Sequence, residues 1–282
     1  MNPKGLLSSV LFCSILVLLA SCSYAVLSTI VSLAVSAGYG IDVVLVGKFF
    51  YGWVILLIIS AIVFAVRKRQ KISWDRKRVV CLAGTGIVMA LVTVCYFHSL
   101  SYLPISLAVV LLFQYSWMGV VIESAANKRL PSKSKTLSCL VIHAGTILAG
   151  GIIGSTISLS EMNPIGILLG LSAAFCYALF VFLSGRVSTD MPPLSKSFSI
   201  STFGMLFVLL FVGTVYGGTA VLEGITNIGS LVYSIPLGIF GIAVPILFLA
   251  VGAPKISTGM ATILNSAELP IEVLLAALII LE

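Results

Sequence analysis

Charged side chains are scarce in this sequence. Only 9% of its 282 residues are Asp, Glu, Lys or Arg, whereas soluble domains carry about 25%. Hydrophobic residues make up 60% of the chain, and its mean hydropathy is +1.20. This lack of charge excludes an ordinary soluble domain, because too few polar side chains remain to cover a surface in water. We therefore predict an integral membrane protein whose surface faces mostly lipid.

The sequence also lacks the motifs of common enzyme classes. It contains no His-Glu-x-x-His, no Gly-x-Ser-x-Gly, and no glycine-rich phosphate loop that ends in Lys followed by Ser or Thr. Its 2 histidines fall in separate apolar segments and cannot supply the usual ligands of a zinc site. We expect no enzyme activity, no metal and no cofactor. A membrane-embedded enzyme with weak motifs stays open as an alternative, and so does a facilitated-diffusion channel.

Nucleic acid is not an expected partner, although the net charge is +7. The basic residues cluster between apolar segments, as membrane topology signals do, and no basic stripe alternates with aromatic residues. The 6 cysteines lie inside apolar segments, where they act as small buried residues rather than as a disulfide framework. The expected partners are the lipid bilayer and a small-molecule substrate.

Long apolar segments divide the chain into spans of about 20 residues, the length that crosses roughly 30 Å of hydrocarbon. These segments are continuous rather than alternating, which favours an all-α fold over a barrel. Leu103-Pro104 splits the longest charge-free interval, because proline lacks the N–H that a helix needs. Nine spans are predicted, at about Leu6–Val35, Asp42–Arg67, Val79–Leu100, Ile105–Ala126, Leu137–Ile157, Pro164–Ser184, Phe198–Tyr216, Leu231–Val251 and Ser257–Leu281.

Basic residues are confined to alternate loops. With Lys4 placed in the cytoplasm, 15 of the 16 lysines and arginines lie on the cytoplasmic side, and only Lys48 lies inside a span. Because cytoplasmic loops are enriched in such residues, we predict a cytoplasmic N-terminus. We expect a multi-pass protein of a bacterial inner (plasma) membrane.

Two segments of the chain share a pattern, one over Tyr96–Leu130 and the other over Leu247–Glu282. In each, a helix closes on a proline turn, the next helix opens with Ile-Ser and small residues, and a polar group follows about ten residues later. These polar groups are Gln114 and Glu268. Five spans separate the copies. Since five is odd, the copies cross the membrane in opposite directions, which predicts an inverted repeat.

Over nearly its whole length the chain resembles the EamA-type family of the drug/metabolite transporter superfamily. The segments that carry the resemblance are Tyr96-Phe97 through Ser106-Leu107-Ala108, Lys128-Arg129-Leu130, and Glu268-Leu269-Pro270. The resemblance implies two inverted five-helix halves, at residues 1–158 with spans one to five and residues 159–282 with spans six to nine. It also implies a tenth helix, which is missing or truncated because the sequence stops at Glu282.

The sequence departs from the family pattern in two further ways. The tryptophan-glycine pair common in the family's first helix is missing, and Lys128 stands where the first half usually has glutamate. Lys48 matches the basic residue that the family often has early in its second helix.

Two carboxylates near the middle of span nine are candidates for carrying a proton. Glu268 and Glu272 are four residues apart and share one face of a helix. Ionisable groups at membrane depth are costly, and two adjacent carboxylates favour protonation of one of them. The alternative is that one is neutral and only forms a hydrogen bond between helices.

Further polar and aromatic residues are expected to converge on a cavity between the halves. For Lys48, extension towards the head groups is nearly as plausible, and for His143 a hydrogen bond to a neighbouring backbone is an equal alternative. Glu123 is expected to pair with Lys128. The predicted substrate-binding set, with the aromatics as walls, is Lys48, Tyr51, Gln114, Tyr115, Trp117, His143 and Glu268.

These features together predict a secondary transporter that exports small organic metabolites by alternating access. No nucleotide-binding motif is present, so the driving force is expected to be an ion gradient. Protons are preferred to sodium, because sodium sites usually need carbonyls of broken helices and such breaks are not evident in the sequence. The sequence indicates neither the substrate nor the oligomeric state.

Overall fold

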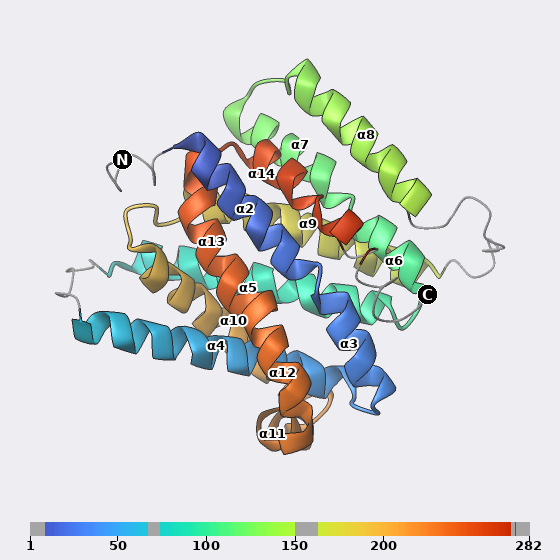
Figure 1. Cartoon of the computed structure of the whole chain (residues 1–282), viewed down its shortest axis with the longest axis vertical. Coiled ribbons are helices and arrows are strands. Elements are labelled where there is room, and N and C mark those ends of the chain that lie inside the picture. The colour runs from blue at the N-terminus through green and yellow to red at the C-terminus, as the bar shows by residue number, and fades with distance from the viewer. Residues whose placement is uncertain (1–8, 67–73, 150–162, 272–273, 275–282) are drawn as a thin grey trace.

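The computed structural model describes residues 9–66, 74–149, 163–271 and 274, and it contains no β-strand within these ranges. Figure 1 shows the helices packed side by side in one bundle, with α8 along one edge of the view and α11 at another. The α-helices are α2 (Val10–Tyr24), α3 (Leu27–Ser36), α4 (Ile41–Val66), α5 (Arg76–Ser99), α6 (Ile105–Leu112), α7 (Tyr115–Asn127), α8 (Lys133–Ala149), α9 (Pro164–Arg186), α10 (Pro193–Val215), α11 (Gly218–Thr226), α12 (Leu231–Gly238), α13 (Val244–Gly252) and α14 (Thr258–Asn265).

Seven helical segments are long and apolar enough to cross a membrane. They correspond to predicted spans one to four and six to eight, so the prediction of a multi-pass helical protein is confirmed. The described part of predicted span five is α8, and that of span nine is α14 with the residues directly after it. The rest of these two spans lies outside the described residues. The seven segments are Val10–Ser36, Ile41–Val66, Arg76–Ser99, Leu107–Asn127, Pro164–Arg186, Pro193–Val215 and Ile228–Lys255.

Several spans are broken helices, contrary to the sequence-based expectation. The chain leaves regular α-helix at Ala25–Val26 between α2 and α3, at Phe113–Gln114 between α6 and α7, and at Ser266–Ala267 after α14. A π-helix, η3 (Ile239–Ala243), separates α12 from α13. Pro245 lies in the first turn of α13, two residues after η3, and lacks the N–H that would continue the α-helical pattern there. The argument against sodium that relied on unbroken helices is therefore wrong.

Side chains stabilise two of these breaks in the same way. At Gln114 the backbone N–H bonds to Leu111, three residues back, and the side-chain Nε2 donates to the carbonyl of Val110 instead (3.0 Å). Ser266 behaves similarly, since its backbone N–H bonds to Ile263 and its hydroxyl donates to the carbonyl of Thr262 (3.2 Å). Each side chain thus satisfies the carbonyl that a regular helix would have paired with the backbone N–H four residues on.

Glycines allow the long helices to approach closely. A Cβ on Gly238 in α12 would lie 2.6 Å from the backbone nitrogen of Gly52 in α4. Likewise, a Cβ on Gly86 in α5 would lie 2.9 Å from the backbone nitrogen of Gly204 in α10. Such backbone-to-backbone contacts replace the hydrophobic driving force that lipid does not supply between membrane helices. The main helix pairs are α5 with α9 and α10, α4 with α10 and α12, α2 with α13 and α14, and α7 with α9 and α14.

The loops rich in Lys and Arg meet at one end of the bundle, which we call the basic end. Polar contacts join these loops to one another: Arg78 pairs with Asp190, and the Arg186 guanidinium donates to the side-chain oxygen of Asn127 (2.7 Å). The basic end comprises Arg76, Lys77, Arg78, Lys128, Arg129, Lys133, Lys135, Arg186 and Lys255.

The opposite end carries a short helix, α11, that the sequence did not predict. Gly224 of α11 packs against α4, where a Cβ would lie 2.6 Å from the Cβ of Val46. Nearby, the Tyr216 hydroxyl donates to Nε2 of His98 (2.9 Å), whose Nδ1 donates to the carbonyl of Val94. Burial raises the pKa of Tyr216, and the charge of Asp42 adds to this effect. These contacts join α5, α10 and α4 at the end opposite the basic loops.

Candidate functional site

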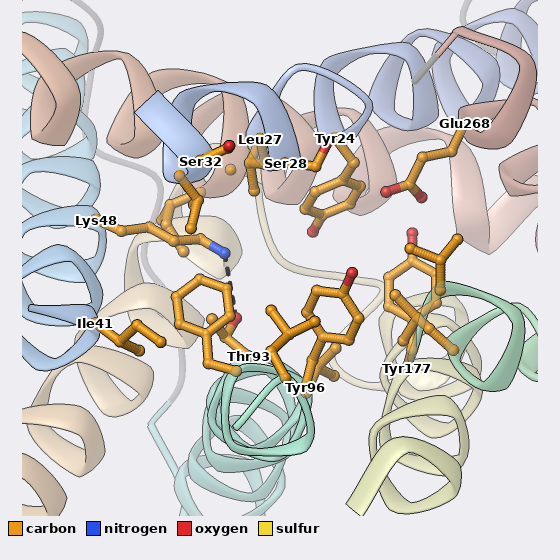
Figure 2. Close-up of a pocket in the computed structure, with 18 of the residues that line it drawn as sticks. Tyr24, Leu27, Ser28, Ser32, Ile41, Lys48, Thr93, Tyr96, Tyr177 and Glu268 are labelled. Atoms are coloured by element: carbon orange, nitrogen blue, oxygen red, sulfur yellow. Dashed lines mark hydrogen bonds between the residues drawn. The ribbon is translucent and has the colours of Figure 1, made fainter. Parts of the chain in front are cut away.

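A cavity of about 370 Å³ lies inside the bundle, lined by residues from α2, α3, α4, α5, α6, α9 and η3 together with Glu268. It extends from the middle of the bundle towards the end opposite the basic end, because its lining includes Ser36, Ile41 and Leu100 at that end. Figure 2 shows its polar side chains pointing inward from several helices. Polar groups at membrane depth mark functional sites.

The helix breaks border this cavity. Tyr24 is the last residue of α2, and Leu112 is the last of α6, so each lining residue directly precedes a break. Glu268 directly follows the break at Ser266–Ala267, and Gly241 lies within the π-helix η3. Broken helices therefore bring backbone and polar groups to one place in the membrane interior, as in many transporter folds.

Lys48 of α4 faces the cavity rather than the head-group region. Its side chain is 5% exposed, its Nζ donates to the hydroxyl of Thr93 (3.2 Å), and it lies 5.8 Å from the ring centre of Phe49. Gly241 leaves room for it, because a Cβ there would lie 2.8 Å from Cε of Lys48. The sequence left two placements open for Lys48, lining a cavity or extending towards the head groups, and in the structure it lines the cavity.

Glu268 lies on the side of the cavity opposite Lys48, as Figure 2 shows. It interacts electrostatically with Lys48 and with the hydroxyl groups of Tyr24 and Tyr177. Its predicted companion, Glu272, lies outside the described residues. The described structure therefore offers one carboxylate, rather than a pair, for any proton chemistry in the cavity.

A buried cluster of tyrosines forms the inner end of the cavity. Tyr177 packs edge-on against Tyr24, with ring centres 5.8 Å apart, and against Tyr115 at 4.5 Å. Its hydroxyl accepts a hydrogen bond from Nδ2 of Asn265 (3.2 Å), and the Asn265 carbonyl in turn accepts from the hydroxyl of Ser21 (2.6 Å). Tyr115 is fully buried and supports Tyr177 without lining the cavity.

Gln114 and His143, both predicted to line the cavity, lie together in a separate cluster. The side-chain oxygen of Gln114 accepts from Nε1 of Trp117 (3.0 Å), and Nε2 of His143 lies 2.9 Å from the same oxygen. Nδ1 of His143 donates to the carbonyl of Cys139 (2.7 Å). The cluster links the break between α6 and α7 to α8, and none of its residues lines the cavity.

Tyr51 serves as a link between helices. Its hydroxyl donates to the carbonyl of Ile225 in α11 (2.6 Å), and it does not line the cavity. The predicted set is thus divided, with Lys48 and Glu268 in the cavity, Tyr115 behind it, Gln114, Trp117 and His143 beside α8, and Tyr51 near α11.

Sequence reasoning missed several residues of the cavity. Tyr24, Thr93, Ser28 and Ser32 line it, and Asn265 supports it. Hydroxyl groups are common in membrane helices, so single-sequence patterns gave no signal for most of them. Asn265 offered one: it lies three residues before Glu268, which puts an uncharged polar group on the face of a predicted functional carboxylate.

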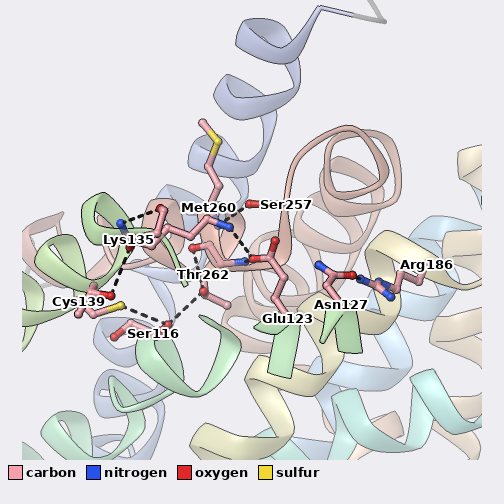
Figure 3. Close-up of polar contacts among 12 residues, drawn as sticks. Ser116, Glu123, Asn127, Lys135, Cys139, Arg186, Ser257, Met260 and Thr262 are labelled. Atoms are coloured by element: carbon pink, nitrogen blue, oxygen red, sulfur yellow. Dashed lines mark hydrogen bonds and ion pairs between the residues drawn. The ribbon is translucent and has the colours of Figure 1, made fainter. Parts of the chain in front are cut away.

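Polar contacts hold the basic end together below the cavity (Figure 3). Glu123 of α7 accepts from Nζ of Lys135 (2.8 Å) and from the backbone N–H of Gly259 in the first turn of α14 (2.7 Å). The expected pair with Lys128 is wrong, because α7 ends at Asn127 and Lys128 adopts a left-handed conformation, with φ of 52°. The helix dipole of α14 favours a negative charge at this position.

Further contacts join α7 to α14 above Glu123. The Thr262 hydroxyl donates to the carbonyl of Ser116 (3.3 Å), and both residues are fully buried. Gly119 lies directly against Thr262, so that a Cβ at this glycine would overlap the threonine side chain. A smaller pocket of about 270 Å³ lies at the basic end, lined in part by Glu123, Arg186 and Thr258. Packed helices therefore separate this pocket from the cavity.

Comparisons with known proteins agree with this architecture. A solved structure, whose title reads only "Crystal structure of protein", superposes with a TM-score of 0.71 over 96% of this chain and 89% of that chain. The two sequences are 16% identical, so the likeness is one of fold. No curated protein sequence matches the chain. The model of the EamA-like transporter family matches residues 164–282. The matched residues include Glu268-Leu269-Pro270, so this part of the chain is similar to the EamA-like transporter family, as its motif predicted.

Proposed function

We propose that this protein is a secondary transporter that moves small organic molecules across a membrane by alternating access, with the 370 Å³ cavity as its substrate site. The observation that carries the proposal is a buried cavity with Lys48 and Glu268 on opposite sides, inside a bundle of apolar helices. Charged groups are costly at this depth and are retained where they bind substrate or ions. The transporter family match supports the same conclusion.

The chain is proposed to consist of two inverted halves, residues 1–158 with spans one to five and residues 159–282 with spans six to nine. The packing supports this division. In such a repeat, the pair α5–α9 corresponds to α13–α2, the pair α10–α5 to α4–α12, and the pair α7–α9 to α14–α2, and each of these pairs is in contact. Both α6 and α14 also have eight residues and are followed by a two-residue break.

The structure is proposed to represent one of two access states. The cavity extends towards the end opposite the basic loops, and the contacts of Glu123 with Lys135 and Gly259 support closure of the basic end. A change of access would require α7 and α14 to separate there. With the basic end in the cytoplasm, as the distribution of Lys and Arg predicts, this state faces outward from a bacterial plasma membrane.

Lys48 and Glu268 are proposed to contact the substrate, with Tyr24, Tyr96 and Tyr177 beside it. Gln114, His143 and Trp117 are proposed to stabilise the break at Phe113–Gln114, where α6 and α7 can change their relative angle. Tyr115 supports Tyr177, and Tyr51 fixes α11 on α4. The residues predicted to form one binding site are thus proposed to have two kinds of role: some contact the substrate, and others stabilise the helices around it.

Protons are proposed as the coupling ion, acting at Glu268 with Glu272 as the second candidate. Among the described residues that line the cavity, Glu268 is the carboxylate, the kind of group that proton-coupled transporters use. The broken helices leave a sodium-coupled variant as the competing outcome, since they supply the carbonyls that sodium sites use.

Proteoliposomes separate these outcomes. A panel of labelled metabolites is tested for movement under an imposed pH gradient, an imposed sodium gradient, and no gradient, with wild type and Glu268→Gln. Proton coupling predicts accumulation only under the pH gradient, its loss with an uncoupler, and its absence in the variant. Equilibration without accumulation under every condition, with the variant unchanged, would contradict coupled transport and support facilitated diffusion.

A further inference from the structure

Lys196 of α10 is a second buried lysine, and it lies near the basic end rather than in the cavity. Its side chain is 1% exposed, and its Nζ donates to the backbone carbonyl of Ser184 in α9 (2.6 Å). No carboxylate pairs with Lys196 among the described residues. A buried ammonium with one neutral partner is costly, because a single carbonyl does not replace the water that burial removes.

Capping of a helix end does not by itself account for this burial. Ser184 lies in the last turn of α9, where free carbonyls favour a nearby cation. Arg186, in the same turn, already supplies a positive charge there from an exposed position. An exposed lysine would add to this at a much lower cost than a buried one. The complete burial of Lys196 favours a role in another arrangement of the helices, in which its ammonium is uncovered.

Matching glycine contacts give the register of the proposed repeat. Gly52 of α4 contacts Gly238 of α12, and Gly204 of α10 contacts Gly86 of α5. Gly52 and Gly204 are as far apart in the sequence as Gly86 and Gly238 are. In the proposed repeat, α4 therefore corresponds to α10 and α5 to α12 and α13, residue by residue.

The same register places Ser184 and Lys196 at positions that correspond to the cavity wall. Ser184 corresponds to Ser32 of α3, which lines the cavity, as Lys48 does (Figure 2). Lys196 corresponds to Val44, one turn from Lys48 on the same face of α4. Lys196 and Ser184 thus lie towards the basic end at the positions that form the wall of the cavity towards the opposite end.

The corresponding helices are apart in one half and in contact in the other. The cavity lies between α3 and α5, which both line it. Their counterparts, α9 and α13 with η4 (Ala253–Lys255), pack together, and a Cβ on Gly185 would lie 3.0 Å from the carbonyl of Ala253. Gly185 and Ala253 also line the small pocket at the basic end. Because Gly185 directly follows Ser184, separation of α9 from η4 would open this pocket towards Lys196.

We propose that Lys196 is an anion-binding residue of a basic-side cavity that forms when α9 separates from η4. In that state its ammonium leaves the carbonyl of Ser184 and binds an anionic group of the transported molecule, such as a carboxylate. The neighbouring Ser195 has a buried hydroxyl with no partner in the described structure, so a second polar group is also left unsatisfied while this end is closed. This inference rests on the proposed function in treating the halves as inverted repeats and the basic end as able to open.

Charged thiol reagents test this site directly. Ser184→Cys is placed in a background without the 6 native cysteines, in oriented proteoliposomes, with and without Glu123→Gln. The second change weakens the contacts of a residue that lines the small pocket and should speed labelling from the basic end. The two reagents are sulfonatoethyl methanethiosulfonate, which is anionic, and trimethylammonioethyl methanethiosulfonate, which is cationic. Each is added in turn to the basic-end side.

The quantity compared is the ratio of the anionic to the cationic labelling rate. We expect this ratio to fall roughly tenfold when Lys196→Met is added, because a positive charge in a narrow site attracts the anionic reagent and repels the cationic one. Lys196→Gln removes the same charge and gives a second variant if Lys196→Met does not fold. An unchanged ratio, or no labelling of Ser184→Cys from the basic end in either background, would overturn the proposal.

The control for the general charge of the basic end is Lys255→Met. Lys255 lies on the exposed surface of η4, where water and salt screen its charge, so its replacement should leave the ratio near its original value. If Lys196 only caps α9, Lys196→Met should lower the unfolding midpoint and leave the ratio unchanged. The ratio of rates therefore separates anion binding from a structural role.

Labelling of Ser28→Cys in the central cavity reports on the proposed function separately. A ratio at Ser184→Cys that depends on Lys196, with Ser28→Cys labelled from one side only in every variant, would keep the anion site and disprove alternating access. Reciprocal changes at Ser28→Cys with no labelling of Ser184→Cys from the basic end would keep alternating access and disprove the site.

Discussion

Lys48 is a buried charge that is costly to the fold and that we propose is necessary for function. Its ammonium is almost completely buried and has one hydrogen-bond partner within the described structure, the hydroxyl of Thr93. Replacing a buried charge by an apolar side chain of similar length is often neutral or stabilising. Functional sites in general retain such unfavourable groups at a cost in stability.

We therefore predict opposite effects of Lys48→Met on stability and on transport. The thermal unfolding midpoint should stay unchanged or rise, because the methionine fills the same space without a charge. Transport in proteoliposomes should fall by roughly tenfold or more, the effect of leaving a substrate charge without its partner. The matched control is Lys255→Met at an exposed lysine, which should change neither quantity. Unchanged transport in Lys48→Met would remove this residue from the substrate site.

At the residue scale the sequence predicted the charged groups better than the uncharged ones. Lys48 and Glu268 stood out because charges inside apolar segments are rare. Tyr24, Thr93 and Asn265 did not, since their residue types occur throughout membrane helices. The wrong partner for Glu123 has a geometric cause: Lys128 is nearer in sequence, but the left-handed turn at this residue ends the helix, and Lys135 of α8 reaches the carboxylate instead.

At the scale of helices, close packing depends on individual glycines. The Cβ of an alanine at position 238 would lie 2.6 Å from a backbone nitrogen of α4, which cannot move aside as a flexible side chain could. Gly84 of α5 has open space where its Cβ would be. These two glycines therefore form a matched pair, one required by packing and one not.

Gly238→Ala should destabilise the protein by about 1–3 kcal/mol, the usual cost of overpacking. Gly84→Ala should be neutral or stabilising by up to about 1 kcal/mol, because alanine favours the helix more than glycine does. Thermal unfolding midpoints measured in one detergent would show the difference. Equal shifts for the two variants would mean that the contact between α12 and α4 does not limit stability.

The broken helix α6–α7 depends on the side chain of Gln114. Its Nε2 donates to the carbonyl of Val110, its oxygen accepts from Trp117, and Nε2 of His143 lies 2.9 Å from the same oxygen. We predict that Gln114→Leu lowers the unfolding midpoint, since each buried group left without a partner costs roughly 1–3 kcal/mol. Gln114→Glu keeps the acceptor oxygen and should lose less. If Gln114→Leu reduces transport without any loss of stability, Gln114 acts on the substrate rather than on the break.

The positions of the helix breaks could not be predicted from the sequence, for a physical reason. Leu103-Pro104 correctly predicted a boundary between two helices, because proline lacks the N–H that a continuing helix needs. The breaks at Ala25–Val26 and Phe113–Gln114 contain neither proline nor glycine. They depend on tertiary partners, and at Gln114 on a side chain that takes over a backbone hydrogen bond. The helix α11 was missed because its nine residues are too few to resemble a span.

For the whole molecule, the sequence predicted an apolar helical bundle with one basic end and a polar interior. It did not predict how that interior is divided. Gln114 and Glu268 occupy similar places in the sequence pattern, yet Glu268 lines the cavity and Gln114 lies beside α8. Side-chain direction at a helix break depends on the local backbone, which a repeat in sequence does not specify.

Alternating access is the central proposal, and it can be tested by comparing how accessible the cavity is from each side of the membrane. Ser28 lines the cavity, so Ser28→Cys in a background without the 6 native cysteines reports which side the cavity faces. The label is a membrane-impermeant thiol reagent added to one side of oriented proteoliposomes at a time. Glu123→Gln weakens the contacts of α7 with Lys135 and Gly259 at the basic end. Glu223→Gln, on exposed α11, is the control.

The measurement is the rate of labelling from each side with and without Glu123→Gln. A single equilibrium between two access states predicts a reciprocal change: labelling from the basic end rises and labelling from the opposite end falls, while Glu223→Gln changes neither. Labelling that rises from both sides together would indicate an open pore, and labelling from one side only in every variant would indicate a fixed cavity. Either result would contradict alternating access.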